Sequence, residues 1–516
     1  MVLAINIVIF AILALALPIC YEENDDIVMA LIASGGYSGT PDYHLVFINV
    51  IYGWGLTLLY GMTQTVEWYT LSFAILHILS MSVISYCIVT MPNRSRWERV
   101  LWLLLLYILW ARNIAALQFT TTAGMTALAG CLLLLRKGAG ARWIGVAMIV
   151  VASLIRITAA GLVGVLMAPI IIYTYRLEWR KYIPLAVMLL LVGGCRIANN
   201  AVYANDPEWK YYSEYNLLRG QLTDNPNAYT LTPDDMPEGI EWKDYRLLLD
   251  YFPDPEQIDL PAVQQLHEIV GKVPFKAKLR NVYRLDRYAV ELAILIGLLV
   301  LIILTTGNWS KYIFLILYTC FVIALMVYVS LDGFLKTRVF ICMLMPILMT
   351  DFLLLPKTTG RKRRWGIVIV MLFLCGWYGY QTNAEQIKKR YSRHNWQVLQ
   401  RPLLDQMPSD AVMVTAGVSM CMEATNPWKV WPYDFRKYTL GWLTWVPLNK
   451  PIGHSYRIFL RDDVVLFTTF DYKKPKSAMQ RICERIEHHY GVKTEVEKIC
   501  GNKQYAVVKI KVKENE

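Results

Sequence analysis

A run of polar residues follows directly after an almost wholly apolar first segment: Glu22, Glu23, Asn24, Asp25 and Asp26. A carboxylate beside a bound lipid phosphate can act as a general base, taking the proton of an acceptor hydroxyl as it attacks an anomeric carbon. Neighbouring helical positions are about 100° apart, so Asp25 and Asp26 do not both point into one cavity. We expect one to be the base and the other to cap a short helix predicted over 27–34. The alternative is a solvated loop with an N-cap.

Cationic side chains could bind the lipid phosphate beside such a base. Several lie at the ends of apolar segments or in a loop on the same predicted side as the acidic run: Arg112, Arg156, Arg196, Lys336 and Arg338, with a basic stretch over 272–287. A guanidinium meets a phosphate with paired hydrogen bonds, so this group suits an anionic lipid phosphate. Arg156 is the first choice because it interrupts an otherwise apolar block. For any single arginine, the alternative is a side chain that extends to water at a span end.

The apolar background determines which elements position these residues. The chain has 516 residues, of which 56% are hydrophobic and 18% charged. This composition argues against a soluble enzyme, a disordered protein and a disulfide-stapled module. Several apolar blocks approach the ~20 residues that cross a bilayer as a helix, which predicts a polytopic α-helical membrane protein. The net charge of +12 is typical of basic cytoplasmic loops and not of nucleic-acid binding.

The basic loops predict the orientation. They lie at 92–99, 136–142, 176–181, 307–310 and 356–365. Lys and Arg in short loops stay cytoplasmic, so all five are placed inside. The blocks 100–135 and 143–175 must then each form a helical hairpin with an outer turn, and 44–62 must lie at the outer interface without crossing. The result is about eleven transmembrane helices. A single long helix over 143–175 would invert everything after it.

The predicted membrane domain covers 1–380 and includes an acidic outer loop over 21–43 and a large outer loop over 199–286. An extracytoplasmic α/β domain is predicted over 381–516. Strand-like runs and one helix indicate its class: strands over 411–415, 464–468, 493–498 and 505–512, and a helix over 478–490. His488 and His489 close that helix and are read as a solvated helix end, not a metal site.

The order of the first elements is distinctive. After the first apolar helix come the acidic residues 23–26, a helix over 27–33, Ser34-Gly35-Gly36, Thr40-Pro41-Asp42 and an apolar aromatic helix over 44–53. This order resembles the first outer loop of the GT-C superfamily of integral membrane glycosyltransferases. In that superfamily one or two acids follow the first span, and two helices lie along the membrane.

The resemblance implies a multi-pass protein of the bacterial plasma membrane with an extracytoplasmic active site. It implies transfer of a sugar from a polyprenyl-phosphate donor to a glycan, lipid or protein acceptor, with membrane lipid as a further partner and no nucleic acid. By the same resemblance Asp25 or Asp26 is the base, and outward-facing arginines bind the donor phosphate. The candidates are Arg156, Arg112, Arg196 and Arg338.

One departure concerns metal. Some GT-C members carry a further acid between the third and fourth spans, but residues 112–122 contain none. A divalent metal is therefore possible but unsupported, and no cofactor is predicted. Three residues are secondary candidates, either in place of the missing acid or for contact with the acceptor: Asp42, Glu67 and His44.

Two other functions are alternatives for a polytopic protein of this composition. An O-antigen-type polysaccharide polymerase or ligase also uses outer arginines, but it is not built around an acid directly after the first span. A lipid-linked oligosaccharide transporter or flippase typically shows two similar halves, and the sequence contains no such repeat.

Overall fold

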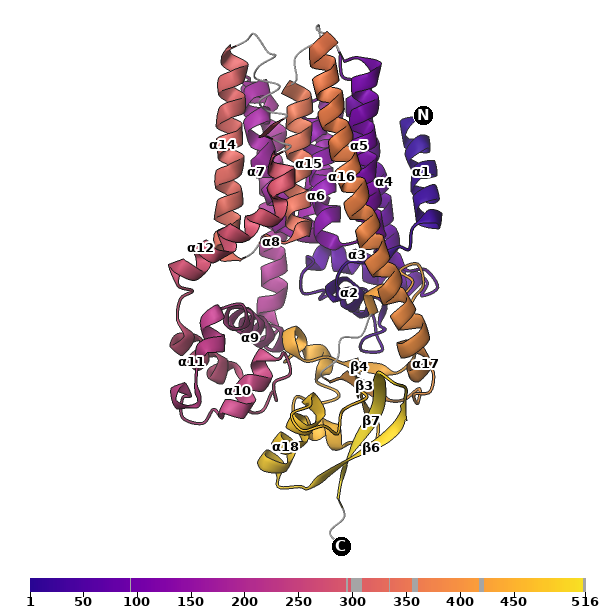
Figure 1. The fold of residues 1–516 in the computed structure, drawn as a ribbon, viewed down its shortest axis with the longest axis vertical. Helices are drawn as coiled ribbons and strands as arrows, with labels where there is room; N and C mark the ends of the chain where they lie inside the picture. Colours follow the sequence, from indigo (N-terminus) through magenta and orange to yellow (C-terminus); the bar gives the residue numbers. More distant parts are fainter. Residues whose placement is uncertain are drawn as a thin grey trace.

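Long apolar helices form a bundle at one end of the molecule, and polar helices with a small sheet form the other end (Figure 1). The structure is a computed structural model. It describes residues 1–92, 94–293, 296–297, 309–333, 335–354, 361–416 and 422–513.

The bundle contains helices with these bounds: α1 Val2–Ala16, α4 Trp68–Val89, α5 Arg96–Ala115, α6 Phe119–Leu134, α7 Ala139–Tyr175, α8 Ile183–Asn205, α14 Trp309–Asp332, α15 Thr337–Leu354 and α16 Arg361–His394. Within the described residues, five helical segments are long and apolar enough to cross a membrane, in α4, α7, α8, α14 and α15. The predicted span over 288–306 falls largely outside the described residues, as does the start of the loop predicted at 307–310.

Both predicted hairpins are present. The block 100–135 breaks between α5 and α6. Helix α7 doubles back at Arg156, whose φ of −154° and ψ of 96° are not helical. The Arg142 guanidinium at the start of α7 lies 5.9 Å from the ring centroid of Tyr175 at its end, and the Tyr175 hydroxyl donates to the carbonyl of Leu134 at 2.6 Å. The two arms therefore run antiparallel, and the alternative of one long helix is wrong.

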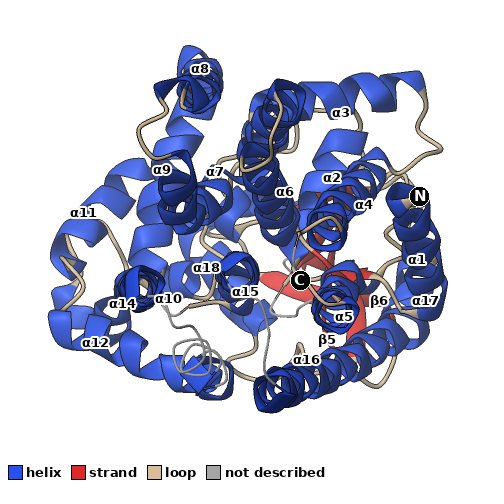
Figure 2. Cartoon of the chain, turned by 90° about the horizontal axis from the view of Figure 1, so that it is seen from above, coloured by secondary structure: helices blue, strands red, loops and turns tan. Residues whose placement is uncertain are grey.

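Helix α3, Val50–Met62, does not run along the bundle. Figure 2 looks down on the bundle and shows α3 lengthwise, while α5 and α6 are seen along their axes. The Asn49 side chain caps α3 by accepting from the backbone N–H of Ile51 at 3.0 Å. This orientation agrees with the prediction that 44–62 does not cross with the bundle helices, and its place at an outer interface stays a prediction.

Of the basic loops, those at 92–99 and 136–142 have described contacts at one end of the bundle. Arg94 donates to the carbonyl of Phe352 at 2.6 Å, and Arg136 lies 4.9 Å from the ring centroid of Tyr86. These contacts bring together the ends of α4, α6 and α15. The chain starts at the same end (Figure 1). The opposite end, where α6 begins and the polar regions attach, is called the domain end below.

The large loop predicted over 199–286 is a small helical unit. Helix α8 continues past the predicted end of its span near 197 and leads into α9 Pro207–Thr223, α10 Trp242–Leu249, α11 Leu260–Val270 and α12 Phe275–Tyr283. This unit has its own core, which includes Tyr215, Leu222, Tyr245, Val263 and Leu266.

The C-terminal region contains a five-stranded sheet in the order β4-β3-β5-β7-β6. The strands are β3 Val412–Thr415, β4 Arg436–Tyr438, β5 Val464–Thr469, β6 Thr494–Gly501 and β7 Tyr505–Val512, and α18 covers Ala478–Tyr490. The predicted strands and helix are confirmed, and β4 was not predicted. Helix α16 crosses the predicted boundary at 380/381 without a break, so the chain leaves the bundle inside a continuous helix.

Close packing of α6 against α7 gives a test of the fold. A Cβ at Gly130 would lie 2.7 Å from the carbonyl oxygen of Gly145. We expect Gly130→Val to lower the apparent melting temperature in detergent, because overpacking costs about 1–3 kcal/mol. Fluorescence-detected size exclusion after heating measures this. Gly161→Val, in the second arm of α7 with nothing within 4 Å of the added Cβ, is the control. Equal melting of the two variants would contradict the packing.

Candidate active site

A two-stranded parallel sheet fixes the acidic run at the domain end. Strand β1, Cys20–Tyr21, pairs with β2, Ala116–Leu117, in the break between α5 and α6. Two cations of α16 hold the same segment: Lys389 donates to the carbonyl of Tyr21 at 2.7 Å, and Arg393 donates to the carbonyl of Ile19 at 2.6 Å. Sequence reasoning missed these two residues because nothing in their local pattern points to a partner so distant in the chain.

Asp26 is fully buried and joins two bundle helices. Its Oδ1 accepts from the Tyr69 hydroxyl at 2.9 Å and from the backbone N–H of Phe119 at 3.0 Å. Burial raises the pKa of the Asp26 carboxyl well above its usual range. Helix α2 begins at Asn24, so the predicted capping of a helix starting at 27 is wrong. Asp26 instead binds the first N–H of α6.

Asp25 is half-buried and lies in a cluster of opposite charge. Burial raises the pKa of the Asp25 carboxyl, and Arg338 is the strongest of the charges that lower it; Lys336 and Arg156 also lower it, and Glu23 raises it. The three cations come from two separate places in the chain: Arg156 lies in the turn of α7, Lys336 directly precedes α15, and Arg338 lies in its first turn. The structure therefore brings Asp25 together with two of the predicted arginines.

Arg156 projects from the non-helical turn of α7 toward this cluster. Its guanidinium lies 5.7 Å from the ring centroid of Phe47 and 5.2 Å from that of Phe119. The rings support the side chain near the start of α6. Arg338 forms an ion pair with Glu23 through Nη1 and Oε1.

The other two predicted arginines lie elsewhere. Arg112 is buried, with its Nη2 3.8 Å from Oε1 of Glu22, so it is directed at the acid that starts the run. Arg196 is exposed on α8 and lines a separate small cavity with Asn49 and Ser153.

The secondary candidates form two other groups. His44 Nδ1 lies 2.8 Å from Oδ1 of Asp42, and its ring stacks on Trp209 of α9 with centroids 4.1 Å apart. Glu67 is buried and accepts from the Tyr60 hydroxyl at 2.5 Å. Burial raises the pKa of Glu67 to about 8.

Glu67 also lines a cavity of about 220 Å³ between α2 and the segment 425–433. Its lining includes Ile27, Leu31 and Ser34 from α2. Positions 27, 31 and 34 share the side of α2 that is turned away from Asp25, given the 100° step of the helix. This cavity is distinct from the charged cluster.

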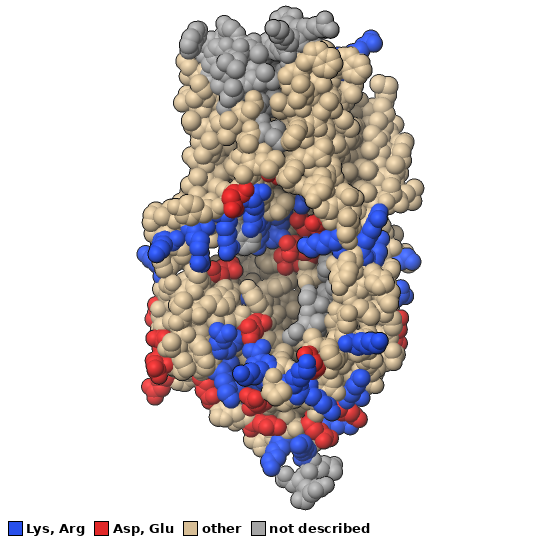
Figure 3. All heavy atoms as spheres, viewed as in Figure 1, with Lys and Arg blue, Asp and Glu red and all other residues tan. Residues whose placement is uncertain are grey.

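The molecular surface is hollowed between the bundle and the polar regions. Figure 3 shows Lys, Arg, Asp and Glu side chains gathered along the upper rim of this hollow, directly below a broad belt free of charge. Charged groups thus collect at the domain end of the apolar surface.

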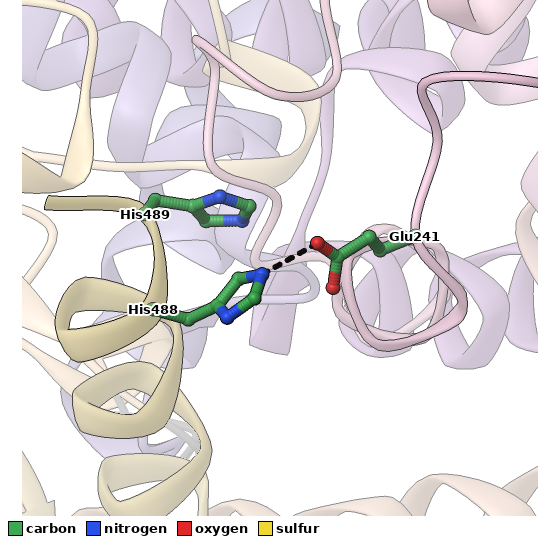
Figure 4. Close-up of side chains that lie close together, drawn as sticks. All are labelled: Glu241, His488 and His489. Carbon is green, nitrogen blue, oxygen red and sulfur yellow. Dashed lines mark hydrogen bonds and ion pairs between the residues drawn. The ribbon is translucent and has the colours of Figure 1, made fainter. Parts of the chain in front are cut away.

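A cluster of Glu241, His488 and His489 joins α10 to α18 (Figure 4). His488 Nε2 lies 2.6 Å from Oε1 of Glu241. The Arg485 guanidinium already pairs with Glu241 at 2.8 Å and with Asp244 at 2.7 Å. The cluster is therefore an ion-pair contact between the helical unit of α9 to α12 and the C-terminal region. The Arg485 side chain supplies its positive charge.

No family model and no curated protein sequence matches the chain significantly. Its structural neighbours include two crystal structures of ArnT from Cupriavidus metallidurans, one in the apo state and one bound to undecaprenyl phosphate. Each is 12% identical, with TM-scores of 0.42 and 0.41, and the similarity covers 98% of this chain and 96% and 97% of the ArnT chains. At this sequence identity and these TM-scores, the structural similarity to ArnT is remote.

The two bonds to Asp26 predict different effects for two substitutions. Asp26→Asn keeps an oxygen that can accept both bonds, so we expect it to fold. Asp26→Leu removes the acceptor, and unsatisfied buried donors cost about 1–3 kcal/mol each. Thermal unfolding of the two variants in the same detergent measures the difference.

The pH dependence of stability gives a second readout. Because the folded-state pKa of Asp26 is raised, its contribution is full below its unfolded pKa of about 4 and is lost as pH rises through the folded value. The melting temperature of the wild type should therefore fall with pH relative to Asp26→Asn. Parallel profiles would show that folding does not raise the pKa of Asp26.

Proposed function

We propose that this chain is a membrane glycosyltransferase that moves a sugar from a polyprenyl-phosphate donor to an acceptor at the domain end of the bundle. Asp25 is the general base. Arg156 and Arg338 bind the donor phosphate, and Lys336 adds positive charge. The transferred group is a hexose or a pentose, and the acceptor is a hydroxyl of a glycan, a lipid or a protein.

The observation that carries this proposal is the convergence of one half-buried acid with three cations at the edge of the apolar belt. The belt accommodates a polyprenyl chain, and the cations lie where its phosphate would emerge. A carboxylate in that position can take the acceptor proton as the new glycosidic bond forms. As the old bond breaks, charge grows on the lipid phosphate, and guanidinium groups stabilise it with paired hydrogen bonds.

The roles of the two acids follow from their surroundings. Asp26 has both described hydrogen bonds on Oδ1 and is enclosed by helices. Asp25 is partly open and is influenced by Arg338, Lys336 and Arg156. We therefore assign catalysis to Asp25 and support of the fold to Asp26.

The resemblance of residues 23–53 to the first outer loop of GT-C enzymes supports the same reaction class. It also supports a bacterial plasma-membrane location with the domain end facing outward. On this proposal the basic loops at the other end are cytoplasmic, as the charge rule expects.

Matched substitutions of the two acids test catalysis. Asp25→Asn should lower the transfer rate by ~10²-fold or more, the scale of general-base removal, while Asp26→Asn should stay within a few fold of wild type. The assay follows release of polyprenyl phosphate from synthetic polyprenyl-phosphate hexose and pentose donors by membranes that contain the protein. If Asp25→Asn releases it at the native rate, the proposed base is wrong.

Two arginines at different places test donor binding. Arg156→Ala should weaken donor use severely, and Arg156→Lys should restore only part, since an ammonium cannot form the paired bonds of a guanidinium. Arg196→Ala, on the exposed side of α8, is the control and should retain near-native donor dependence. Near-native use by Arg156→Ala would remove this residue from the site.

The charges around Asp25 predict the pH dependence of transfer. The base works only when ionised, and Arg338 lowers its pKa whereas Glu23 raises it. Arg338→Gln should therefore move the acid limb of kcat/KM to higher pH, and Glu23→Gln should move it to lower pH. Shifts in the same direction for both variants would contradict Asp25 as the titrating group.

A further inference from the structure

Helix α12, Phe275–Tyr283, is a short amphipathic helix with no buried residue. Its large apolar side chains are exposed: Phe275 by 68%, Leu279 by 38% and Tyr283 by 78%. Positions 275, 279 and 283 are four residues apart and form one stripe along the helix. A soluble helix normally buries such a stripe, so its exposure indicates contact with something outside the chain.

Positive charge flanks this stripe. Lys276 and Arg280 are exposed on α12, and Lys272 is exposed just before it. No acidic residue occurs between Lys272 and Leu285. An apolar stripe bordered by Lys and Arg is typical of a helix that lies in the plane of a membrane surface. The uniform charge favours a negatively charged surface.

The position of α12 along the bundle agrees with a location at the membrane surface. Shortly after the helix, the Tyr288 hydroxyl donates to the carbonyl of Leu335 at 2.8 Å, and the Tyr288 ring stacks on Phe340 with centroids 4.0 Å apart. Leu335 directly precedes Lys336. Helix α12 thus lies at the depth of the charged cluster around Asp25, and Figure 1 shows it at the base of α14.

The surface view agrees. In Figure 3 a row of Lys and Arg lies over the position of α12, immediately below the uncharged belt of the bundle. Helix α12, which carries the exposed apolar stripe, is therefore next to the surface that lipid chains would cover. This continuity favours lipid over a second protein as the occupant.

We propose that α12 lies in the headgroup layer of the membrane and binds anionic phospholipids. Phe275, Leu279 and Tyr283 enter the boundary of the acyl chains. Lys272, Lys276 and Arg280 bind lipid phosphates. The proposal is independent of sugar transfer and holds whichever reaction the chain catalyses.

Bound lipid provides the first test. The protein is placed in nanodiscs of phosphatidylcholine with one third phosphatidylglycerol, extracted gently, and its bound lipids are counted by native mass spectrometry. Lys272→Gln/Lys276→Gln/Arg280→Gln should lose bound phosphatidylglycerol at least two-fold. Lys473→Gln/Lys503→Gln/Lys513→Gln, three exposed lysines of the sheet domain, is the charge-matched control and should retain it. Equal phosphatidylglycerol binding by the two triple variants overturns the proposal.

Depth provides the second test. A fluorescent amino acid at position 283 should be quenched by lipids brominated near the headgroup, and a fluorescent residue at position 503 should not. Absence of lipid quenching at 283 overturns the proposal, as does protection of 283 that appears only when a second protein is added. Asp25→Asn should behave as wild type in both tests, so failure of the glycosyltransferase proposal and failure of this one are distinguishable.

Discussion

The burial of the Asp26 carboxyl is the interaction on which the candidate site depends. A polar group with no contact to water is costly unless hydrogen bonds compensate it, and here both bonds to the Asp26 carboxyl come from other helices. The Tyr69 hydroxyl belongs to α4, and the Phe119 N–H belongs to the first turn of α6. Because α2 carries Asp26, these bonds fix the rotation of α2 and thereby the direction of the neighbouring Asp25. Asp26 thus fixes the position of α2, and Asp25 takes its direction from it.

Hydrogen bonds from distant segments also satisfy the backbone polar groups around the acidic run. The loop between α1 and α2 carries polar groups close to the apolar belt, where water cannot satisfy all of them. The β1–β2 pair satisfies some, and Lys389 and Arg393 of α16 satisfy others. These bonds join the first helix of the chain to the helix that leads into the sheet domain. The sheet domain is therefore mechanically connected to the acidic run.

A second connection runs through Tyr37. Its hydroxyl donates to Oδ1 of Asn449 at 3.0 Å and accepts from the backbone N–H of Thr439 at 3.2 Å. Burial raises the pKa of Tyr37 to about 12, so it stays neutral at ordinary pH. This residue directly follows the Gly35-Gly36 turn that ends α2. Helix α16 thus holds the segment before α2, and the C-terminal region holds Tyr37 just after it, so the helix of the two acids is fixed on both sides.

The sequence by itself determined the elements that follow from local pattern and charge. Apolar blocks of sufficient length predicted the bundle, basic loops predicted the hairpin at 143–175, and strand-like runs predicted strands such as 505–512. The depth of Arg156 followed from the same hairpin. These features depend on short-range chemistry that one chain segment contains in full.

Only the tertiary structure decided which acid is open to the site. Asp25 and Asp26 are equivalent in local sequence, and the choice depends on Tyr69 and Phe119, which are distant along the chain. The attachment of the acidic run by Lys389 and the extra strand β4 have the same cause. Each depends on a contact between a side chain or strand edge and a distant segment of the chain. The packing of the whole bundle determines which distant segments come into contact.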